Sequence, residues 1–186
     1  RQGQVHLSTA DLHKYLLANQ LPSQKGPTPI VYNTWLDNFD DLDVDRLRRQ
    51  LKTAKEIGCE VFTVDAGWFG TGDGPWYKQV GDWREKNSGA FNGRMAEFAN
   101  EVRDAGLGFG LWKEAERLVA SVPIVQEHPD WFFKANDSLR YPNLTNPKAF
   151  DYVYSETSRL IETYQVSWMK LDFNMVFGVD PLGTEF

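Results

Sequence analysis

The segment CEVFTVDAGW, residues 59–68, predicts a buried β-strand that ends in a polar and aromatic group, Asp65 to Trp68. The segment before it, residues 43–57, places apolar side chains at helical spacing and stops at Gly58, the residue type that most often ends a helix. A long loop rich in glycine and tryptophan follows the strand. The helix and the strand that follows it form one unit of a repeating helix–strand pattern.

The same alternation continues on both sides of this segment. The expected strands are residues 29–35 (PIVYNTW), 59–68, 107–116 (LGFGLWKEAE) and 166–173 (VSWMKLDF), and the expected helices are residues 43–57, 93–106, about 120–127 and 147–164. Repeated βα units favour a parallel sheet with helical crossovers. We therefore predict an α/β fold of the (β/α)₈ TIM-barrel type, partial, with about the first four βα units.

Polar and aromatic side chains gather where these strands end. They are Asp65, Glu114, Glu116, Asp172 and Asn174, with Trp35, Trp68 and Trp112 at or near the same ends. Such residues at the carboxyl ends of successive parallel strands are typical of the active-site face of a (β/α)₈ barrel. An open doubly wound sheet would also bind ligands at that edge, but at one switch point. The glycines of residues 70–74 lack the spacing of a phosphate-binding loop.

The segment WMKLDFN, residues 168–174, places Lys170 and Asp172 on one face of a strand, because strand side chains alternate. A carboxylate beside a cation stays ionised at neutral pH and is available as a nucleophile or as a partner for a developing cation. A structural ion pair at the mouth of the strand is the alternative interpretation.

The tryptophans allow two interpretations as well. Each one alone is explained by packing, and this includes the loop pair Trp76 and Trp83. Grouped beside carboxylates, indoles suit sugar binding, because they offer flat apolar faces and an N–H donor.

The roles of Glu114 and Glu116 stay open between contact with a ligand and pairing with Arg117 and Lys113. Oxygen ligation of a divalent ion by Asp65, Glu114 and Asp172 is a further alternative. No histidine is near them in sequence, which argues against a zinc or iron site, and we expect no cofactor.

Composition excludes several classes of protein. The 186 residues carry a net charge of -6 with no basic cluster, so no nucleic-acid interface is expected. No apolar run is long enough to span a membrane, and the amino end lacks a signal-peptide core. A single cysteine, Cys59, forms no internal disulfide. We therefore expect a cytoplasmic protein.

We expect two regions, a helix capped at Ser8–Thr9 with a proline-rich linker over residues 1–28, and a half-barrel over residues 29–186. The chain starts at Arg1 and ends at Phe186, soon after a strand, which suggests a piece of a longer protein. The edges of the first and fourth strands would be open, which favours a homo-oligomer.

Five motifs in order resemble the catalytic barrel of family 36 glycoside hydrolases, the α-galactosidases of bacterial and fungal type. They are PIVYNTW, VDAGWFG…GDW, FGLWKEAER, HPDWF and MKLDFN, and the resemblance covers about residues 29–181. It implies hydrolysis of an α-galactoside oligosaccharide with retention of configuration. By this resemblance the segment before residue 29 is similar to the connection between a β-sandwich domain and the barrel.

The resemblance also implies residue roles. Asp172 matches the nucleophile that forms a covalent glycosyl-enzyme, and Lys170 matches a ligand of sugar hydroxyls. Asp65 matches an acid that holds galactose hydroxyls, and Trp35 and Trp112 match aromatic residues lining the pocket. The remaining members of the same motifs, Trp68 and Asn174, are expected to bind substrate too.

The sequence departs from the family at three points. Ala66 stands where many relatives have a second acid, and Ala115 interrupts a Glu-Pro-Glu motif. The family's general acid/base is an aspartate in a later strand, outside this chain. Retaining glycosidases need two carboxyl groups about 5–5.5 Å apart, so we expect this chain alone to be inactive. The alternatives are a non-catalytic carbohydrate-binding or self-associating half-barrel, or an α-glycosidase acting on N-acetylgalactosaminides or glucosides.

Overall fold

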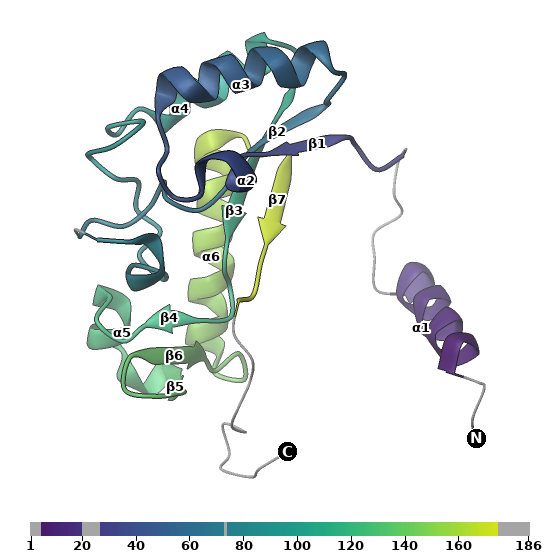
Figure 1. The fold of residues 1–186 in the computed structure, drawn as a ribbon. Coiled ribbons are helices and arrows are strands. Elements are labelled where there is room, and N and C mark those ends of the chain that lie inside the picture. The colour runs from purple at the N-terminus through teal and green to yellow at the C-terminus, as the bar shows by residue number, and fades with distance from the viewer. Residues whose placement is uncertain (1–4, 20–26, 73, 175–186) are drawn as a thin grey trace.

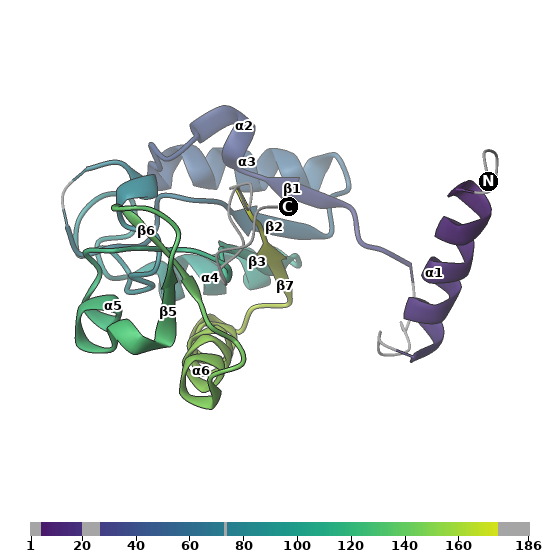
Figure 2. The ribbon, with the colours of Figure 1, turned by 90° about the horizontal axis from the view of Figure 1, so that it is seen from below.

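Four parallel strands form the central sheet of the computed structural model, which describes residues 5–19, 27–72 and 74–174. The strands are β1 (Val31–Asn33), β2 (Val61–Val64), β3 (Gly108–Lys113) and β7 (Trp168–Leu171), in the order β1-β2-β3-β7. Each pairs in parallel with its neighbour. The predicted α/β class with a parallel sheet is confirmed, and the strand row is that of a partial barrel (Figures 1 and 2).

Three helices connect these strands in sequence. They are α3 (Val44–Glu56), α4 (Met95–Asp104) and α6 (Pro147–Tyr164). The Asp43 side chain caps α3 by accepting a hydrogen bond from the Arg46 backbone N–H at 2.7 Å. Gly58, just past that helix, has a φ of 87°, a conformation that glycine adopts without strain. The sequence therefore marks both ends of the helix, and α6 has the predicted bounds.

The helices pack against one face of the sheet through a single apolar cluster. It includes Phe62 and Val64 of β2, Phe109 and Leu111 of β3, Leu47 and Leu51 of α3, Phe98 and Val102 of α4, and Leu160 of α6. Burial of this apolar area drives the layers together.

The opposite face of the sheet is tightly packed at one point, where Thr63 of β2 lies beside Gly110 of β3. A Cβ atom on Gly110 would lie 2.2 Å from Thr63 Oγ1, so only glycine fits there. This close approach keeps β2 and β3 in register just below the residues that end them.

A small antiparallel sheet interrupts the connection between β3 and α6, and the sequence did not indicate it. Its strands are β4 (Leu118–Val119), β5 (Phe132–Lys134) and β6 (Leu139–Pro142), in the order β4-β6-β5. The short helices α5 (Pro123–Glu127) and η2 (Pro129–Trp131) precede β5. Leu118, Val122, Val125 and Phe132 form a separate apolar cluster under this sheet.

Two expectations near the amino end were wrong. Helix α1 (Val5–Asn19) begins before Ser8 and Thr9, so these residues lie inside the helix and do not cap it. The first strand ends at Asn33, and Trp35 begins a short helix, α2 (Trp35–Asn38). Helix α1 stands away from the sheet in both views (Figures 1 and 2). Within the described residues, no helix combines the length and hydrophobicity needed to cross a bilayer.

Candidate active site

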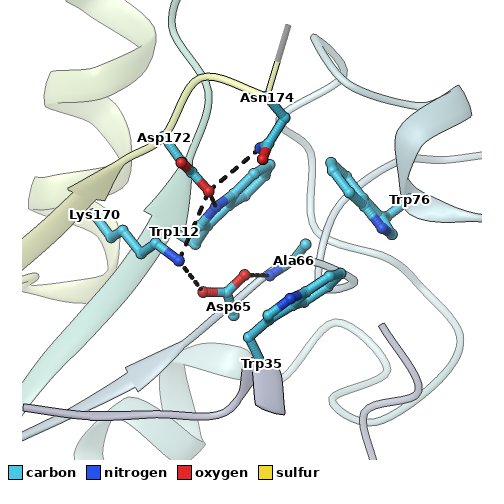
Figure 3. Close-up of a pocket in the computed structure, with 8 residues that line it drawn as sticks. All are labelled: Trp35, Asp65, Ala66, Trp76, Trp112, Lys170, Asp172 and Asn174. Atoms are coloured by element: carbon cyan, nitrogen blue, oxygen red, sulfur yellow. Dashed lines mark hydrogen bonds and ion pairs between the residues drawn. The ribbon is translucent and has the colours of Figure 1, made fainter. Parts of the chain in front are cut away.

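A pocket at the carboxyl end of the sheet is built from all four strand ends and one loop (Figure 3). Its lining residues are Trp35, Asp65, Ala66, Trp76, Trp112, Lys170, Asp172 and Asn174. The volume of this pocket is about 60 Å³. All the predicted site residues except Trp68 line it.

Asp65 is the most enclosed acid of the pocket, with 3% of its side chain exposed. Its Oδ2 accepts hydrogen bonds from Asn33 Nδ2 at 2.7 Å and from Lys170 Nζ at 2.9 Å. Its Oδ1 accepts one from the Ala66 backbone N–H at 2.9 Å, which Figure 3 shows together with the lysine contact. A carboxylate held by three donors is fixed in orientation and suited to holding a ligand.

Asp172 is more accessible, with 34% of its side chain exposed. Its Oδ2 accepts hydrogen bonds from Trp112 Nε1 at 3.0 Å and Asn174 Nδ2 at 3.3 Å, and Lys170 Nζ lies 3.7 Å away. Partial burial alone would raise the pKa of Asp172. The hydrogen bonds from Trp112 and Asn174 and the charge of Lys170 outweigh burial and hold this pKa below its ordinary value. Asp172 is therefore an ionised carboxylate at neutral pH.

Lys170 joins the two aspartates, because its Nζ contacts both Asp65 and Asp172. An ammonium group has three donors, and these two contacts leave it able to bind a ligand hydroxyl as well. The side chain is 36% exposed. The same geometry bears on the divalent-ion alternative, because the lysine charge lies between two of the three proposed ligands. No group of three potential metal-binding side chains occurs among the described residues.

Aromatic rings form the walls around the carboxylates. Trp76 meets Trp35 and Trp112 edge to face, with ring centroids 5.8 and 5.3 Å apart. Trp76 comes from the loop after β2, in the 3₁₀ turn η1 (Trp76–Lys78). The sequence raised this residue only as one of a loop pair, because a loop tryptophan carries no strand-end signal.

Trp68 does not line the pocket. It is 1% exposed and lies in the core behind the pocket, where it contacts Phe69, Trp83 and Tyr164. Its indole Nε1 donates a hydrogen bond to the Trp112 backbone carbonyl at 3.1 Å. Trp68 therefore supports Trp112, which itself contacts Asp172, and contact of Trp68 with substrate stays a prediction.

The open question about Glu114 is answered by its pairing. Glu114 is fully buried, and its carboxylate accepts hydrogen bonds from Arg117 Nε and from Arg117 Nη2 at 2.8 Å. Its Oε1 also accepts from Asn174 Nδ2 at 2.8 Å. Because Asn174 donates to Asp172 as well, the buried Glu114–Arg117 pair helps to fix the environment of Asp172. Glu116 accepts a hydrogen bond from the Ala115 backbone N–H at 3.1 Å.

Lys113 takes no part in that pair and points to the other face of β3. It is 1% exposed, its Nζ lies 5.0 Å from the Trp83 ring centroid, and Nζ donates to the Glu114 carbonyl at 3.4 Å. Burial lowers the pKa of Lys113 to about 8, although the charges of Glu156 and Glu116 raise it and that of Arg159 lowers it further.

The arrangement supports one kind of chemistry well. It offers an ionised, accessible carboxylate, a neighbouring ammonium group, a fixed second carboxylate and flat indole faces. This set can bind a polyhydroxylated ring and present a nucleophile to it. The Melibiase family model matches residues 2–180 of the sequence. The chain belongs to the Melibiase family.

Other Melibiase-type proteins are similar in sequence and fold. An α-galactosidase of Escherichia coli is 31% identical over 162 residues, which are 83% of this chain and 22% of that protein. The crystal structure of an α-galactosidase from Lactobacillus brevis matches with a TM-score of 0.70 and 28% identity, covering 80% of this chain and 21% of that one.

A further structure contains a ligand. It is a variant of the GH36 α-galactosidase AgaA from Geobacillus stearothermophilus in complex with raffinose, with a TM-score of 0.66 and 25% identity. The match covers 80% of this chain and 22% of that one. This Melibiase chain thus spans less than a quarter of the length of each of these relatives.

Proposed function

We propose that this chain carries the nucleophile-bearing half of a retaining α-galactosidase active site. The observation that carries the proposal is Asp172 with its donors Trp112, Asn174 and Lys170, placed beside the fixed carboxylate of Asp65. Membership in the Melibiase family and similarity to α-galactosidases support the choice of sugar. The proposed substrate is the terminal α-galactosyl unit of an oligosaccharide, and one relative is described in complex with raffinose.

In the proposed reaction, Asp65 accepts hydrogen bonds from the hydroxyls of galactose and Lys170 donates hydrogen bonds to them. Trp35 and Trp112 contact the apolar face of the sugar. A carboxylate oxygen of Asp172 attacks the anomeric carbon while the bond from that carbon to the leaving oxygen breaks. A covalent galactosyl ester forms, and water later cleaves it. The charge of Lys170 and the indole N–H of Trp112 keep the attacking carboxylate ionised.

The second carboxyl group of this reaction protonates the leaving oxygen and later activates water. Asp65 and Glu114 are each engaged by three donors, so they are poor candidates for proton exchange. We propose that the general acid/base lies outside this chain. The chain alone would then form the ester only with a substrate whose leaving group needs no proton.

α-Galactosyl fluoride is such a substrate, because fluoride leaves without general acid assistance. Incubation with the chain is expected to add one galactosyl group per molecule, detected by intact mass spectrometry, with one equivalent of fluoride released. Peptide mapping should locate the adduct on Asp172. The adduct should persist, because no base is available to activate water.

Two variants serve as controls for this labelling. Asp172→Asn keeps the shape of the side chain and should abolish the adduct, whereas Asp172→Ala tests the same point without a polar group. An adduct on another residue, or equal labelling of Asp172→Asn, would refute the assignment of the nucleophile. Binding of galactose without any labelling of the wild-type chain would favour the non-catalytic carbohydrate-binding alternative.

Ala66 motivates a second candidate for the sugar. Its methyl group lines the pocket next to Asp65, at a position where it gives no ligand to a sugar hydroxyl. An enzyme for α-glucosides or α-N-acetylgalactosaminides is therefore a rival proposal. Competition of glucose and N-acetylgalactosamine with galactose against labelling would distinguish them, and galactose should protect best.

A further inference from the structure

A second hollow lies beside the candidate active site, between the turn η1 and the antiparallel sheet. Its volume is about 590 Å³, within the range of small-molecule sites. The residues that matter for the argument are Tyr77, Lys78, Arg117, Asn136, Ser138 and Leu139. We call this hollow the hairpin groove, because the turn between β5 and β6 forms one of its sides.

The hairpin groove adjoins the active-site pocket through one shared wall. Trp76 lines the pocket, and the next residue, Tyr77, lines the groove. The guanidinium carbon of Arg117, another residue of the groove, lies 5.6 Å from the centroid of the Trp76 ring. The pocket and the groove are therefore neighbours at Trp76.

The groove is fixed in shape by buried contacts. Arg117 is 6% exposed, and its Nε and Nη2 both donate to the fully buried carboxylate of Glu114. On the opposite side, Asn136 Oδ1 accepts hydrogen bonds from the backbone N–H groups of Ser138 and Leu139, each at 2.9 Å. Both polar side chains are held before a ligand arrives, which lowers the entropy lost on binding.

The chemistry of the groove matches a sugar. Tyr77 is 50% exposed and offers a flat apolar face. Arg117 Nη1 and the Asn136 amide nitrogen donate no hydrogen bond within the described part of the chain, and both are donors suited to hydroxyl oxygens. The lining carries both signs of charge, from Lys78, Arg117 and Asp137, so a neutral polar ligand fits better than a strongly charged one.

We infer that the hairpin groove binds the sugar units on the leaving-group side of an α-galactoside oligosaccharide. The terminal galactose would occupy the pocket, and the next hexose would stack on Tyr77 and accept hydrogen bonds from Arg117 Nη1 and the Asn136 amide nitrogen. This inference rests on the proposed function, because the pocket fixes which end of the oligosaccharide enters the groove. It adds a specificity determinant that lies in the antiparallel sheet.

Calorimetric titration of the chain with galactose and with raffinose tests the inference. The Asp172→Asn background prevents reaction during the titration, and galactose is also titrated into the wild-type chain. Raffinose is expected to bind about tenfold tighter than galactose. Tyr77→Ala should reduce that ratio by about fivefold to tenfold, the effect of losing one aromatic contact, with little change for galactose.

Two further variants complete the design. Ser138→Leu fills the groove from an exposed position and should lower the affinity for raffinose alone. Tyr154→Ala removes a tyrosine of α6 that is 65% exposed and outside both sites, and should leave the ratio unchanged. An unchanged ratio in both Tyr77→Ala and Ser138→Leu would overturn the inference. Absence of galactose binding and of labelling by α-galactosyl fluoride would instead refute the proposed function.

Discussion

Asp65 follows β2 and Asp172 follows β7, at the same edge of one sheet, yet the solvent exposure of their side chains differs greatly. The Asp65 side chain is 3% exposed and the Asp172 side chain is 34% exposed. β2 lies inside the strand row, and β7 is the last strand of the order β1-β2-β3-β7. The inner strand thus provides a carboxylate that is fixed by three donors, and the outer strand provides one that a ligand can approach.

The contrast shows how one sheet divides two tasks between identical side chains. Burial with full hydrogen bonding gives a rigid ligand, because any movement of Asp65 would leave donors unpaired. Partial exposure together with hydrogen-bond donors gives a carboxylate that stays ionised and can still be approached by a ligand. A second buried carboxylate, Glu114, is also fixed by its donors, and it reaches Asp172 through Asn174. We call the buried carboxylates Asp65 and Glu114 with their donors the rigid side of the site, and Asp172 the accessible side.

The largest effect on folding stability is expected when the buried carboxylate of Glu114, on the rigid side, loses the positive charge of Arg117. Arg117→Ala leaves the carboxylate of Glu114 buried, with Asn174 as its one remaining donor within the described residues, and breaking such a pair destabilises a protein by about 3–5 kcal/mol. Chemical denaturation of the purified variant measures this loss. Arg48→Ala is the matched control, because Arg48 pairs with Glu101 at the surface, where a pair contributes about 0–1 kcal/mol. Equal losses in both variants would show that burial does not distinguish the two pairs.

An intermediate effect of opposite sign is expected at Lys113, a buried charge that forms no ion pair with a carboxylate among the described residues. Lys113→Met keeps an unbranched side chain that is one heavy atom shorter and removes the charge, so we expect stabilisation of about 1–3 kcal/mol at pH 7. Lys52→Met, at a lysine whose side chain is 79% exposed, should change stability by less than about 0.5 kcal/mol.

The stability gained by Lys113→Met should depend on pH. The folded chain loses the Lys113 proton near pH 8 and the unfolded chain loses it near 10.5. Between these values the unfolded state binds more protons, so the stability of the wild-type chain rises with pH through this window. The advantage of Lys113→Met should be largest below pH 8 and vanish above 10.5. A constant advantage, or destabilisation at pH 7, would contradict the assignment of a buried charge.

Much of the rigid side could be predicted from the sequence, because strand ends and helix ends carry local signals. Asp43, Gly58 and Pro147 mark helix ends, and α6 has the predicted bounds. Asp65 and Asp172 follow apolar strands and Lys170 lies near the end of β7, so their meeting at one edge follows from parallel topology.

The remaining features depend on contacts between distant segments. The strands of the antiparallel sheet have two to four residues, too few for a period-two pattern. Trp68 is a motif residue, but its indole turns to the Trp112 carbonyl 44 positions away. Glu114 had two candidate cations, and only the loop after β3 decides that Arg117 is the partner. These choices are made by packing, which spacing along the chain does not report.

The smallest expected effect lies on the accessible side, at the hydrogen bond from Trp112 Nε1 to Asp172 Oδ2. Trp112→Phe keeps an aromatic wall but removes this donor, so the pKa of Asp172 should rise from its lowered value. A group with a lowered folded pKa stabilises the fold above its unfolded pKa, and this contribution is lost as pH falls through the folded pKa. The loss should therefore begin at higher pH in the variant.

The labelling reaction would report the same shift directly, because in the proposed reaction only ionised Asp172 attacks α-galactosyl fluoride. The rate of labelling, followed by mass spectrometry across acidic pH, should fall off at higher pH in Trp112→Phe than in the wild-type chain. Trp131→Phe, in the turn before β5, replaces an indole that stacks on His128. This control should leave the acid limb of the pH–rate profile, the pH range where labelling slows, where it is in the wild-type chain. If both variants keep the wild-type limb, the indole of Trp112 does not hold Asp172 ionised. The accessibility of β7 and the charge of Lys170 would then suffice to account for its reactivity.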